Sequence, residues 1–417
     1  MPAMMRGMNT PHYIRYTAVP LQIAMVTETY PPEVNGVAVT IGHMVRGLLR
    51  RRHRIHLIRP RQSRQEVAVQ EGASQQGGFE ETLVAGMPIP GYPGLKLGLP
   101  AKGTLLRLWK KQRPDIVHIA TEGPLGWSAM SAARKLGIPI STDFHTNFHS
   151  YTEHYGIGLL MKPMAAYLRN FHNKANCTMV PTATLKWDLE EDLYNDVLVV
   201  PRGVDTALFH PAKRSAELRK SWGVEDDTPV AILVSRMAAE KNLPVVIQTY
   251  EEMRKVKPEL KLVMVGDGPL RAELERANPH VIFAGMRTGE DLAAHYASGD
   301  IFLYPSVTET YGNVTVESMC SGLATIAYDY AAAHMHIQHG VNGLLVPFND
   351  TGAFIAHAKA LLTDPERIRR LRTEARLTVE RPTWDDAMVH LESALIEVIL
   401  GTQGANHVKD GIVAATD

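Results

Sequence analysis

Two glutamates, Glu309 and Glu317, are the residues of this 417-residue chain whose type and spacing first suggest chemistry. They follow an apolar run at 301–304, which is typical of a buried strand, and a glycine-containing turn lies between them. The spacing predicts a helix over 314–321, whose first turn would offer backbone N–H groups and the positive end of a dipole to an anion. We therefore expect an anion site with a carboxylate on either side. The same pair also fits a turn residue and a simple partner of the helix dipole.

Two cations stand in the same half of the chain. Arg236 and Lys241 follow an apolar run at 230–234 that predicts another buried strand. A forked guanidinium and a compact ammonium suit a diphosphate, and they would stabilise the charge that builds on a leaving phosphate. As isolated residues they would be ordinary surface cations. Together with the two glutamates they favour a site for a phosphorylated ligand.

A third group of polar residues follows the apolar run at 138–142. His145 and His149 are four residues apart and Glu153 continues the series, a spacing that on a helix suits metal binding. The sequence does not indicate a convincing third metal ligand beside the two histidines, so we expect no bound metal here.

The elements that must position these residues alternate along the chain. Apolar runs of strand length recur at 21–26, 115–119, 138–142, 179–183, 230–234, 260–265, 281–284, 301–304 and 323–328. Segments of helical periodicity lie between several of them, as at 37–49, 122–136 and 162–173. This alternation predicts an α/β fold with parallel sheets. The length predicts two domains, because a chain of this size exceeds one ordinary core.

The motifs resemble those of a known family. The segment SVTETYGNVTVESMCSG, which contains Glu309 and Glu317, resembles the Glu-x7-Glu signature of the retaining, GT-B type glycosyltransferases of family 4. The segments DFHT, with His145, and SRMAAEKN, with Arg236 and Lys241, resemble other elements of that family, as does VLVVPRGVDTALFHP. The resemblance extends from about Leu21 to Leu400.

The resemblance implies a GT-B architecture of two Rossmann-like domains that face each other across a cleft. We expect an extension at 1–20, an acceptor domain at 21–204 and a nucleotide-sugar domain at 205–383. The last helix, 384–400, would cross back onto the first domain, and 401–417 would form a loose polar tail. The boundary near residue 205 rests on the segment from Arg202 to Pro211, although Arg202 and Asp205 also fit a local turn pair.

The resemblance also implies roles for individual residues. His145 would approach the donor sugar, a task that suits an imidazole because its charge changes near neutral pH. Arg236 and Lys241 would hold the diphosphate, Glu309 the sugar and Glu317 the ribose. Other donor-binding residues would be Gly36, Arg287, Thr310, Tyr311, Gly312, Asn313 and Val314. The family has a Gly-Gly pair where this chain has Asn35 and Gly36, so Gly36 is the better match.

The substrates follow from the resemblance as well. The variant DYAAA, with Ala331 to Ala333 in place of the usual Gly-Gly and acid, is similar to bacterial GDP-mannose-dependent alpha-mannosyltransferases and, more distantly, to sulfoquinovosyl diacylglycerol synthase. We expect a metal-independent hexose transfer from a nucleotide-diphosphate sugar, with GDP-mannose favoured, to a lipid acceptor. Front-face attack would retain the anomeric configuration. The alternatives are a UDP-sugar donor, a phosphorylase or hydrolase on this fold, and a non-catalytic membrane-surface binding protein.

Charge is unevenly distributed, although 44 Lys and Arg balance 44 Asp and Glu. Residues 1–203 carry 23 basic and 15 acidic residues, so the first half is basic and the second is acidic. A run of arginines adjoins apolar residues and comprises Arg46, Arg50, Arg51, Arg52, Arg54, Arg59, Arg61 and Arg64. The segment 94–113 adds further cations. This predicts contact with an anionic membrane surface. A solvated face is the plain alternative, and no nucleic-acid motif favours that partner.

The remaining composition indicates a compartment. The two cysteines, Cys177 and Cys320, are too few for a disulfide framework, which favours a reducing environment. No apolar run reaches the roughly 18 residues that a membrane span needs, and the first twenty residues lack the apolar core of a secretory signal. We expect a cytoplasmic protein, peripheral on the inner face of the membrane.

Overall fold

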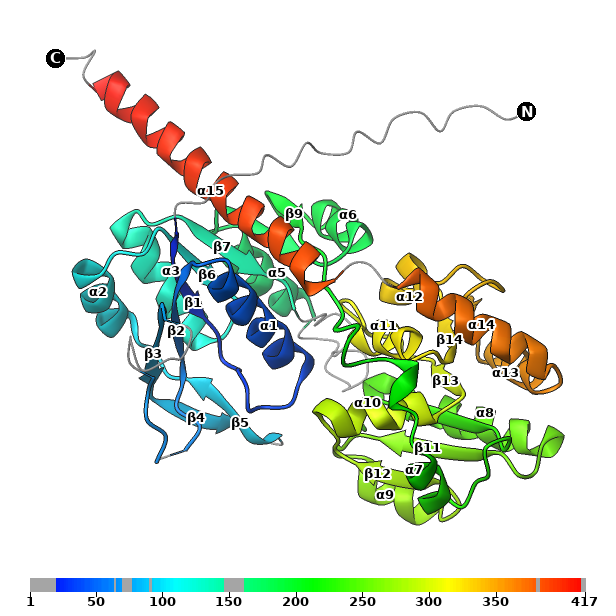
Figure 1. Ribbon diagram of the computed structural model, residues 1–417. Coiled ribbons are helices and arrows are strands. Elements are labelled where there is room, and N and C mark those ends of the chain that lie inside the picture. The colour runs from blue at the N-terminus through cyan, green and yellow to red at the C-terminus, as the bar shows by residue number, and fades with distance from the viewer. Residues whose placement is uncertain are drawn as a thin grey trace, which may run out of the picture.

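The computed structural model describes residues 20–63, 65–69, 77–89, 92–145, 161–379 and 383–413. His149 and Glu153, the two residues of the expected metal-binding spacing beyond His145, lie outside these ranges. The chain forms two α/β units, each built on a parallel sheet (Figure 1). The expected fold class is confirmed.

The first sheet has seven parallel strands, and most of their residues are buried. Its order is β3 (Phe79–Val84), β2 (Arg54–Pro60), β1 (Gln22–Val26), β6 (Ile116–Ile119), β7 (Ile140–Asp143), β8 (Cys177–Val180) and β9 (Val197–Val199). The strand expected at 179–183 therefore lies a few residues earlier. A short antiparallel hairpin, β4 (Gly86–Ile89) with β5 (Tyr92–Gly98), adjoins this sheet.

Successive residues of β1 explain why helices cover both faces of this sheet. Ile23 and Met25 pack with α1 (Gly36–Arg50) and α15 (Trp384–Val413). Ala24 and Val26 pack with the other side, formed by α2 (Lys102–Lys111), α3 (Pro124–Leu136) and α5 (Met161–His172). A parallel strand buried on both faces is typically apolar along its buried length, as β1 is from Ile23 to Val26. The helix α6 (Ala183–Glu191) follows β8.

The second sheet has six parallel strands around one continuous core. Its order is β12 (Ile282–Gly285), β11 (Lys261–Val265), β10 (Val230–Val234), β13 (Ile301–Tyr304), β14 (Ala324–Tyr328) and β15 (Leu344–Val346). Its helices are α7 (Ala216–Ser221), α8 (Leu243–Val256), α9 (Arg271–Ala277), α10 (Gly289–Ser298), α11 (Asn313–Cys320), α12 (Ala331–His336), α13 (Thr351–Leu362) and α14 (Pro365–Thr378).

Each sheet reverses its strand order at one point. In the first sheet the reversal lies between β1 and β6, and in the second it lies between β10 and β13. In doubly wound sheets, ligands bind outside the carboxyl ends of the strands at this reversal, because the loops of the two neighbouring strands leave in opposite directions. The topology therefore directs attention to the loops after β10 and β13.

The helix α15 runs back across the first unit (Figure 1). Its Met388 side chain lies where Gly47 of α1 has no side chain, so the two helices approach closely. Glu392 accepts a hydrogen bond from Arg51 and lies 2.9 Å from Nε2 of the buried His53. These contacts fasten the end of the chain to the first sheet.

The prediction of a loose tail from residue 401 is wrong for residues 401–413, which continue α15 to Val413. The Thr402 hydroxyl donates to the Val398 carbonyl oxygen at 2.8 Å, a bond within the same helix. No proline interrupts this segment. Extending an existing helix costs less than starting one, so the helix passes Gly401.

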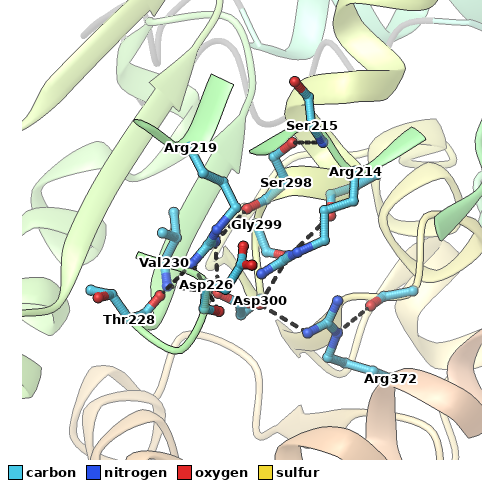
Figure 2. A network of polar contacts seen from close by, with 12 residues as sticks. Arg214, Ser215, Arg219, Asp226, Thr228, Val230, Ser298, Gly299, Asp300 and Arg372 are labelled. Carbon is cyan, nitrogen blue, oxygen red and sulfur yellow. Dashed lines mark hydrogen bonds and ion pairs between the residues drawn. The ribbon is translucent and has the colours of Figure 1, made fainter. Parts of the chain in front are cut away.

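A buried polar network fixes the end of the second sheet opposite the β10 and β13 loops. Figure 2 shows Asp300, which precedes β13, surrounded by Arg214, Arg219 and Arg372. The arginine nitrogens lie 3.2, 3.3 and 2.8 Å from its carboxylate, and the Val230 N–H donates to it at 2.9 Å. Arg219 is buried and also donates to the carbonyl oxygens of neighbouring turns. The network ties α7, α14 and two strands together.

Candidate functional site

The loops after β10 and β13 meet at the Lys241–Glu309 pair. Lys241 ends a short 3-10 turn (Ala239–Lys241), and its ammonium donates to the Glu309 carboxylate and, at 3.3 Å, to the Thr308 carbonyl oxygen. Both side chains keep about one-sixth of their surface accessible, 16% and 15%. Two of the predicted site residues are thus brought into direct contact at the reversal point of the sheet.

The described hydrogen bonds to the Glu309 side chain all end on one carboxylate oxygen. The Oε1 atom accepts hydrogen bonds from Lys241, from the Tyr304 hydroxyl and, at 2.7 Å, from the Ser306 hydroxyl. Charge-assisted bonds of this kind are stronger than neutral ones. Three donors on a single oxygen fix the orientation of the carboxylate.

The helix α11 starts beside this carboxylate, as the spacing predicts. Gly312 precedes it with φ 93°, a left-handed conformation that favours glycine. Because glycine has no side chain, Gly312 cannot cap the first N–H groups of the helix. The amino end of α11, with Asn313 and Val314, therefore has donors available for an anion.

Thr310 connects the two units. Its hydroxyl donates to the backbone oxygen of His145 at 2.7 Å. The next residue, Tyr311, is buried, and its hydroxyl lies 3.0 Å from Nε2 of His336. The Tyr311 ring thus belongs to the core, which leaves its backbone N–H as the part able to contact a ligand.

Glu317 lies one turn into α11 and is half-buried. Burial raises the pKa of its carboxyl to about 7, and a hydrogen bond of 2.9 Å from the Tyr296 hydroxyl opposes that rise. A carboxyl that titrates near neutral pH is typical of functional sites.

Arg236 is half-buried in the first loop after β10. The turn at Gly266 supports this loop, since φ at Gly266 is 132° and a Cβ there would collide with the Ser235 carbonyl oxygen. The Met237 N–H donates to the Asp267 carbonyl oxygen at 2.9 Å. The glycine turn after β11 therefore sets the course of the backbone that carries Arg236.

His145 lies at the end of β7 in a buried cluster of charges. Arg202 donates to its Nδ1 at 3.2 Å, which leaves the proton of the neutral ring on Nε2, 3.1 Å from the Asp143 carboxylate. The Arg202 guanidinium also lies 3.5 Å from the Asp143 carboxylate, and Nε2 of His118 lies 3.6 Å from the same carboxylate. Burial lowers the pKa of His145. Burial opposes ionisation of Asp143, but Arg202 and the histidines hold the pKa of Asp143 well below its usual range.

Two predicted binding residues stand apart from this constellation. Gly36 is the exposed first residue of α1, and Asn35 caps that helix by accepting from the Ala38 N–H at 2.8 Å. The Arg287 guanidinium binds its own turn, donating to the Ala284 carbonyl oxygen at 2.9 Å and to Asp291 at 3.0 Å. The described side-chain contacts of Arg287 are local, Gly36 has no side chain, and no described contact joins either residue to the glutamates.

The predicted arginine run does not form one exposed surface. Arg59 is buried in β2 and bonds Glu66 and Glu81, while Arg50 and Arg51 pair with acidic residues of α15. The cations of α2 differ. Lys102, Arg107, Lys110 and Lys111 are exposed, and within the described part of the chain none of them has an acidic partner.

Five residues of the site were given no role in it from the sequence: Asp143, Arg202, Ser306, Tyr296 and Tyr304. Asp143, Arg202 and Ser306 lie within the quoted motifs, but the motifs did not indicate their contacts, and Tyr304 closes an apolar run. The alternative of a local turn pair of Arg202 with Asp205 is not formed, since Asp205 accepts from the Leu208 N–H at 2.9 Å and Arg202 faces Asp143 and His145. The one available signal was position, since Asp143 and Ser306 stand at or just beyond strand ends.

Comparisons of the sequence with known proteins identify the family of this chain. The family model for Glycosyltransferase Family 4 matches residues 34–208, and that for Glycosyl transferases group 1 matches residues 228–364. A GDP-mannose-dependent alpha-mannosyltransferase of Corynebacterium glutamicum is 30% identical over 92% of this chain and 91% of its own length. The chain belongs to glycosyltransferase family 4.

Two further relatives are named for other transfer activities. The sulfoquinovosyl transferase SQD2 of Arabidopsis thaliana is 30% identical over 73% of this chain and 61% of its own length. The alpha-monoglucosyldiacylglycerol synthase of Streptococcus pneumoniae is 27% identical over 74% of this chain and 71% of its own. The resemblance inferred from the motifs is confirmed.

A solved structure confirms the GT-B fold of this family member. Sucrose-phosphate synthase from Thermosynechococcus elongatus superposes with a TM-score of 0.74 at 16% identity, covering 91% of this chain and 99% of its own. The chain is thus a glycosyltransferase of GT-B architecture. Among its described residues, no helix is long and apolar enough to cross a bilayer.

Proposed function

We propose that this glycosyltransferase moves mannose from GDP-mannose to a lipid acceptor and retains the anomeric configuration. The donor follows the mannosyltransferase relative, which matches over nearly its full length. The lipid acceptor follows the diacylglycerol-linked relative. The observation that carries the proposal is the Lys241–Glu309 contact at the reversal point of the second sheet, beside the amino end of α11.

The residues divide the task by charge. Arg236 and Lys241 neutralise the diphosphate, and the amino end of α11 offers N–H donors to it. Glu309 accepts hydrogen bonds from hydroxyls of the sugar, and Glu317 accepts them from the ribose. His145, fixed by Asp143 and Arg202, borders the sugar from the first unit.

The transfer step proceeds on one face of the sugar. The bond from the anomeric carbon to the phosphate oxygen breaks as the bond to the acceptor oxygen forms, and the acceptor proton passes to the departing phosphate. The nearby carboxylates suit other tasks, because Glu309 is bound by three donors and Asp143 is buried beneath His145. Trapping a covalent glycosyl-enzyme would overturn this step.

Metal independence is part of the proposal. In the proposal, Arg236 and Lys241 offset the charge that develops on the leaving diphosphate, and in this role they replace a divalent ion. Transfer measured after dialysis against EDTA should equal transfer in added magnesium to within about twofold. A large loss that magnesium restores would refute this part.

The α2 helix is the surface we propose for contact with anionic lipid. Its exposed cations, Lys102, Arg107, Lys110 and Lys111, have no described acidic partner, and each basic residue near such a surface contributes about 1 kcal/mol. Lys110→Glu with Lys111→Glu should lower co-sedimentation with phosphatidylglycerol vesicles roughly tenfold or more. The charge-matched control, Arg369→Glu with Arg370→Glu on exposed α14, should sediment like the parent, and equal losses would refute the proposal.

The donor is tested by product analysis combined with thermal shift. GDP and GDP-mannose should raise the melting temperature, because a ligand that binds only the folded state stabilises it. Product should form only with a lipid acceptor present. A response to UDP species alone would favour a glucosyl, glucuronosyl or sulfoquinovosyl donor, and release of free sugar without acceptor would favour a hydrolase.

A further inference from the structure

Each glutamate of the donor site is contacted by one buried tyrosine. The Tyr304 hydroxyl donates to Oε1 of Glu309, and the Tyr296 hydroxyl donates to Oε2 of Glu317 at 2.9 Å. Tyr304 has 5% of its surface exposed and Tyr296 has none. Neither tyrosine belongs to the Glu-x7-Glu segment, since Tyr304 ends β13 and Tyr296 lies on α10.

The two tyrosines are parts of one packed aromatic group. The Phe302 ring lies 5.9 Å from Tyr296 and 5.5 Å from Tyr304, measured between ring centroids. Phe209 packs edge-on against Tyr296 at 5.6 Å. Rings in such a cluster have little rotamer freedom, so the two hydroxyls are held in fixed positions relative to each other.

The hydroxyls are oriented as donors. Burial and the adjoining carboxylates raise the pKa of both tyrosines well above the ordinary value, so both remain protonated. A carboxylate oxygen that faces such a hydroxyl accepts its proton in a hydrogen bond, and the bond favours the ionised carboxylate.

The bonds leave one oxygen of each carboxylate available. All hydrogen bonds that Glu309 makes to described residues end on Oε1, which Lys241 and Ser306 share with Tyr304. The bond that Glu317 makes ends on Oε2. Within the described part of the chain, Oε2 of Glu309 and Oε1 of Glu317 therefore keep their accepting capacity for hydroxyls of a ligand.

We propose that Tyr304 and Tyr296 are positioning residues that each fix one carboxylate oxygen, so that the other oxygen accepts a hydroxyl of the donor. This rests on the proposed function. Tyr304 acts through Glu309 on the sugar, and Tyr296 acts through Glu317 on the ribose. The two tyrosines should therefore affect different kinetic quantities, whereas two tyrosines that only fill the core would affect stability alone.

The test uses Tyr304→Phe and Tyr296→Phe, which remove the hydroxyls and keep the rings. Tyr250→Phe is the matched control, because this buried tyrosine of the same unit donates to the Leu260 carbonyl oxygen at 3.3 Å and has no described contact with either glutamate of the donor site. Tyr304→Phe should lower kcat roughly tenfold and leave the Kd of GDP within about twofold. Tyr296→Phe should raise the Kd of GDP roughly tenfold, with a proportionate rise in the KM of the sugar donor.

Ser306→Ala provides a second variant, at a small buried residue. It removes another donor to Oε1 of Glu309 and should lower kcat in the same direction as Tyr304→Phe, even if that variant folds poorly. An unchanged kcat in both Tyr304→Phe and Ser306→Ala would overturn the assignment of Tyr304. An unchanged Kd in Tyr296→Phe would overturn that of Tyr296.

The measurement of nucleotide binding separates this inference from the proposed function. If the parent binds GDP, or UDP in a parallel titration, but transfers no sugar, the proposed transfer fails. Weaker nucleotide binding by Tyr296→Phe would then still support the Tyr296 assignment. Losses of equal size in all three phenylalanine variants would mean that the tyrosines act only through stability, and would refute the proposal.

Discussion

At the scale of single residues, the site depends on carboxylates whose charge is set by their neighbours. Glu309 has three donors on one oxygen, including a cation. Glu317 has one described donor, and burial raises the pKa of its carboxyl to about 7. The charge of Glu317 therefore changes near neutral pH.

Replacing Glu317 with Gln should stabilise the protein at alkaline pH while weakening the donor site. Because the pKa of this carboxyl is higher folded than unfolded, the native state holds the extra proton between about pH 4.5 and 7, and stability falls as pH rises through this window. Glu317→Gln removes that loss. At pH 8 its free energy of unfolding should exceed that of the parent by at least ~1 kcal/mol, measured by urea denaturation.

The same variant should bind GDP roughly tenfold more weakly, because an amide accepts hydrogen bonds less strongly than a carboxylate. Donor affinity of the parent should fall as pH drops below 7, and that of Glu317→Gln should stay flat. A variant with lower stability at pH 8, or with unchanged affinity, contradicts the assigned role.

Arg202 is one of the groups that set the pKa of His145. The groups facing this ring are Arg202, Asp143 and, at longer range, Glu122; burial and Arg202 lower the pKa of His145, while the two carboxylates raise it. Arg202→Met should therefore raise the pKa of His145, so that the ring gains its proton at a higher pH. Histidine NMR titration, with His145→Gln to identify the resonance, measures the shift.

Arg202→Lys supplies the comparison, since it keeps the positive charge beside Asp143. It should move the pKa of His145 less than Arg202→Met does. A titration of His145 that is the same in the parent and in Arg202→Met would show that the guanidinium does not set the charge of the ring.

At the scale of elements, strands and turns deliver these side chains to one place. The β10 and β13 loops meet because the strands are neighbours at the reversal of the sheet, and the Asp300 network anchors the opposite ends of the same two strands. The network serves stability, since its arginines bond backbone carbonyl oxygens and a single buried aspartate (Figure 2).

Asp300→Ala should destabilise the second unit by about 3–5 kcal/mol, because three arginines would lose a shared buried partner. Glu366→Ala is the control, since it breaks an exposed pair with Arg369 and should cost about 0–1 kcal/mol. Urea denaturation followed by circular dichroism measures both. Losses of the same size would show that the Asp300 network contributes no more than a surface pair.

Much of the element pattern could be predicted from the sequence. Apolar runs predict the strands within a few residues because a doubly covered parallel strand must be apolar throughout, as 230–234 and 301–304 show. Helix α1 and the start of α11 were predicted from periodicity and from the glycine turn. The continuation of α15 past Gly401 was missed, because helix extension depends on the helix that precedes it.

Contacts between distant segments could not be predicted in this way. Arg202 meets Asp143, 59 residues earlier, and Tyr296 meets Glu317, 21 residues later. Such pairs depend on strand order, which periodicity does not encode. The arginine run shows the reverse error, since its charges are adjacent in the sequence but Arg59 points into the core and bonds Glu81.

At the scale of the whole molecule, the two units share the site. Thr310 of the second unit donates to the backbone of His145 in the first, and α15 returns the end of the chain to the first sheet. In the proposed function, a donor held by the second unit would be presented to groups of the first, and the chemistry would take place between these two sets of residues.

The most direct test is transfer from GDP-mannose to diacylglycerol in anionic vesicles, with the anomer of the product read by NMR. The account predicts an alpha-mannosyl lipid with the parent, and a loss of roughly 100-fold or more in kcat with Glu309→Gln at unchanged GDP affinity. A parent that transfers no sugar from any nucleotide donor, or a Glu309→Gln variant as active as the parent, would contradict it.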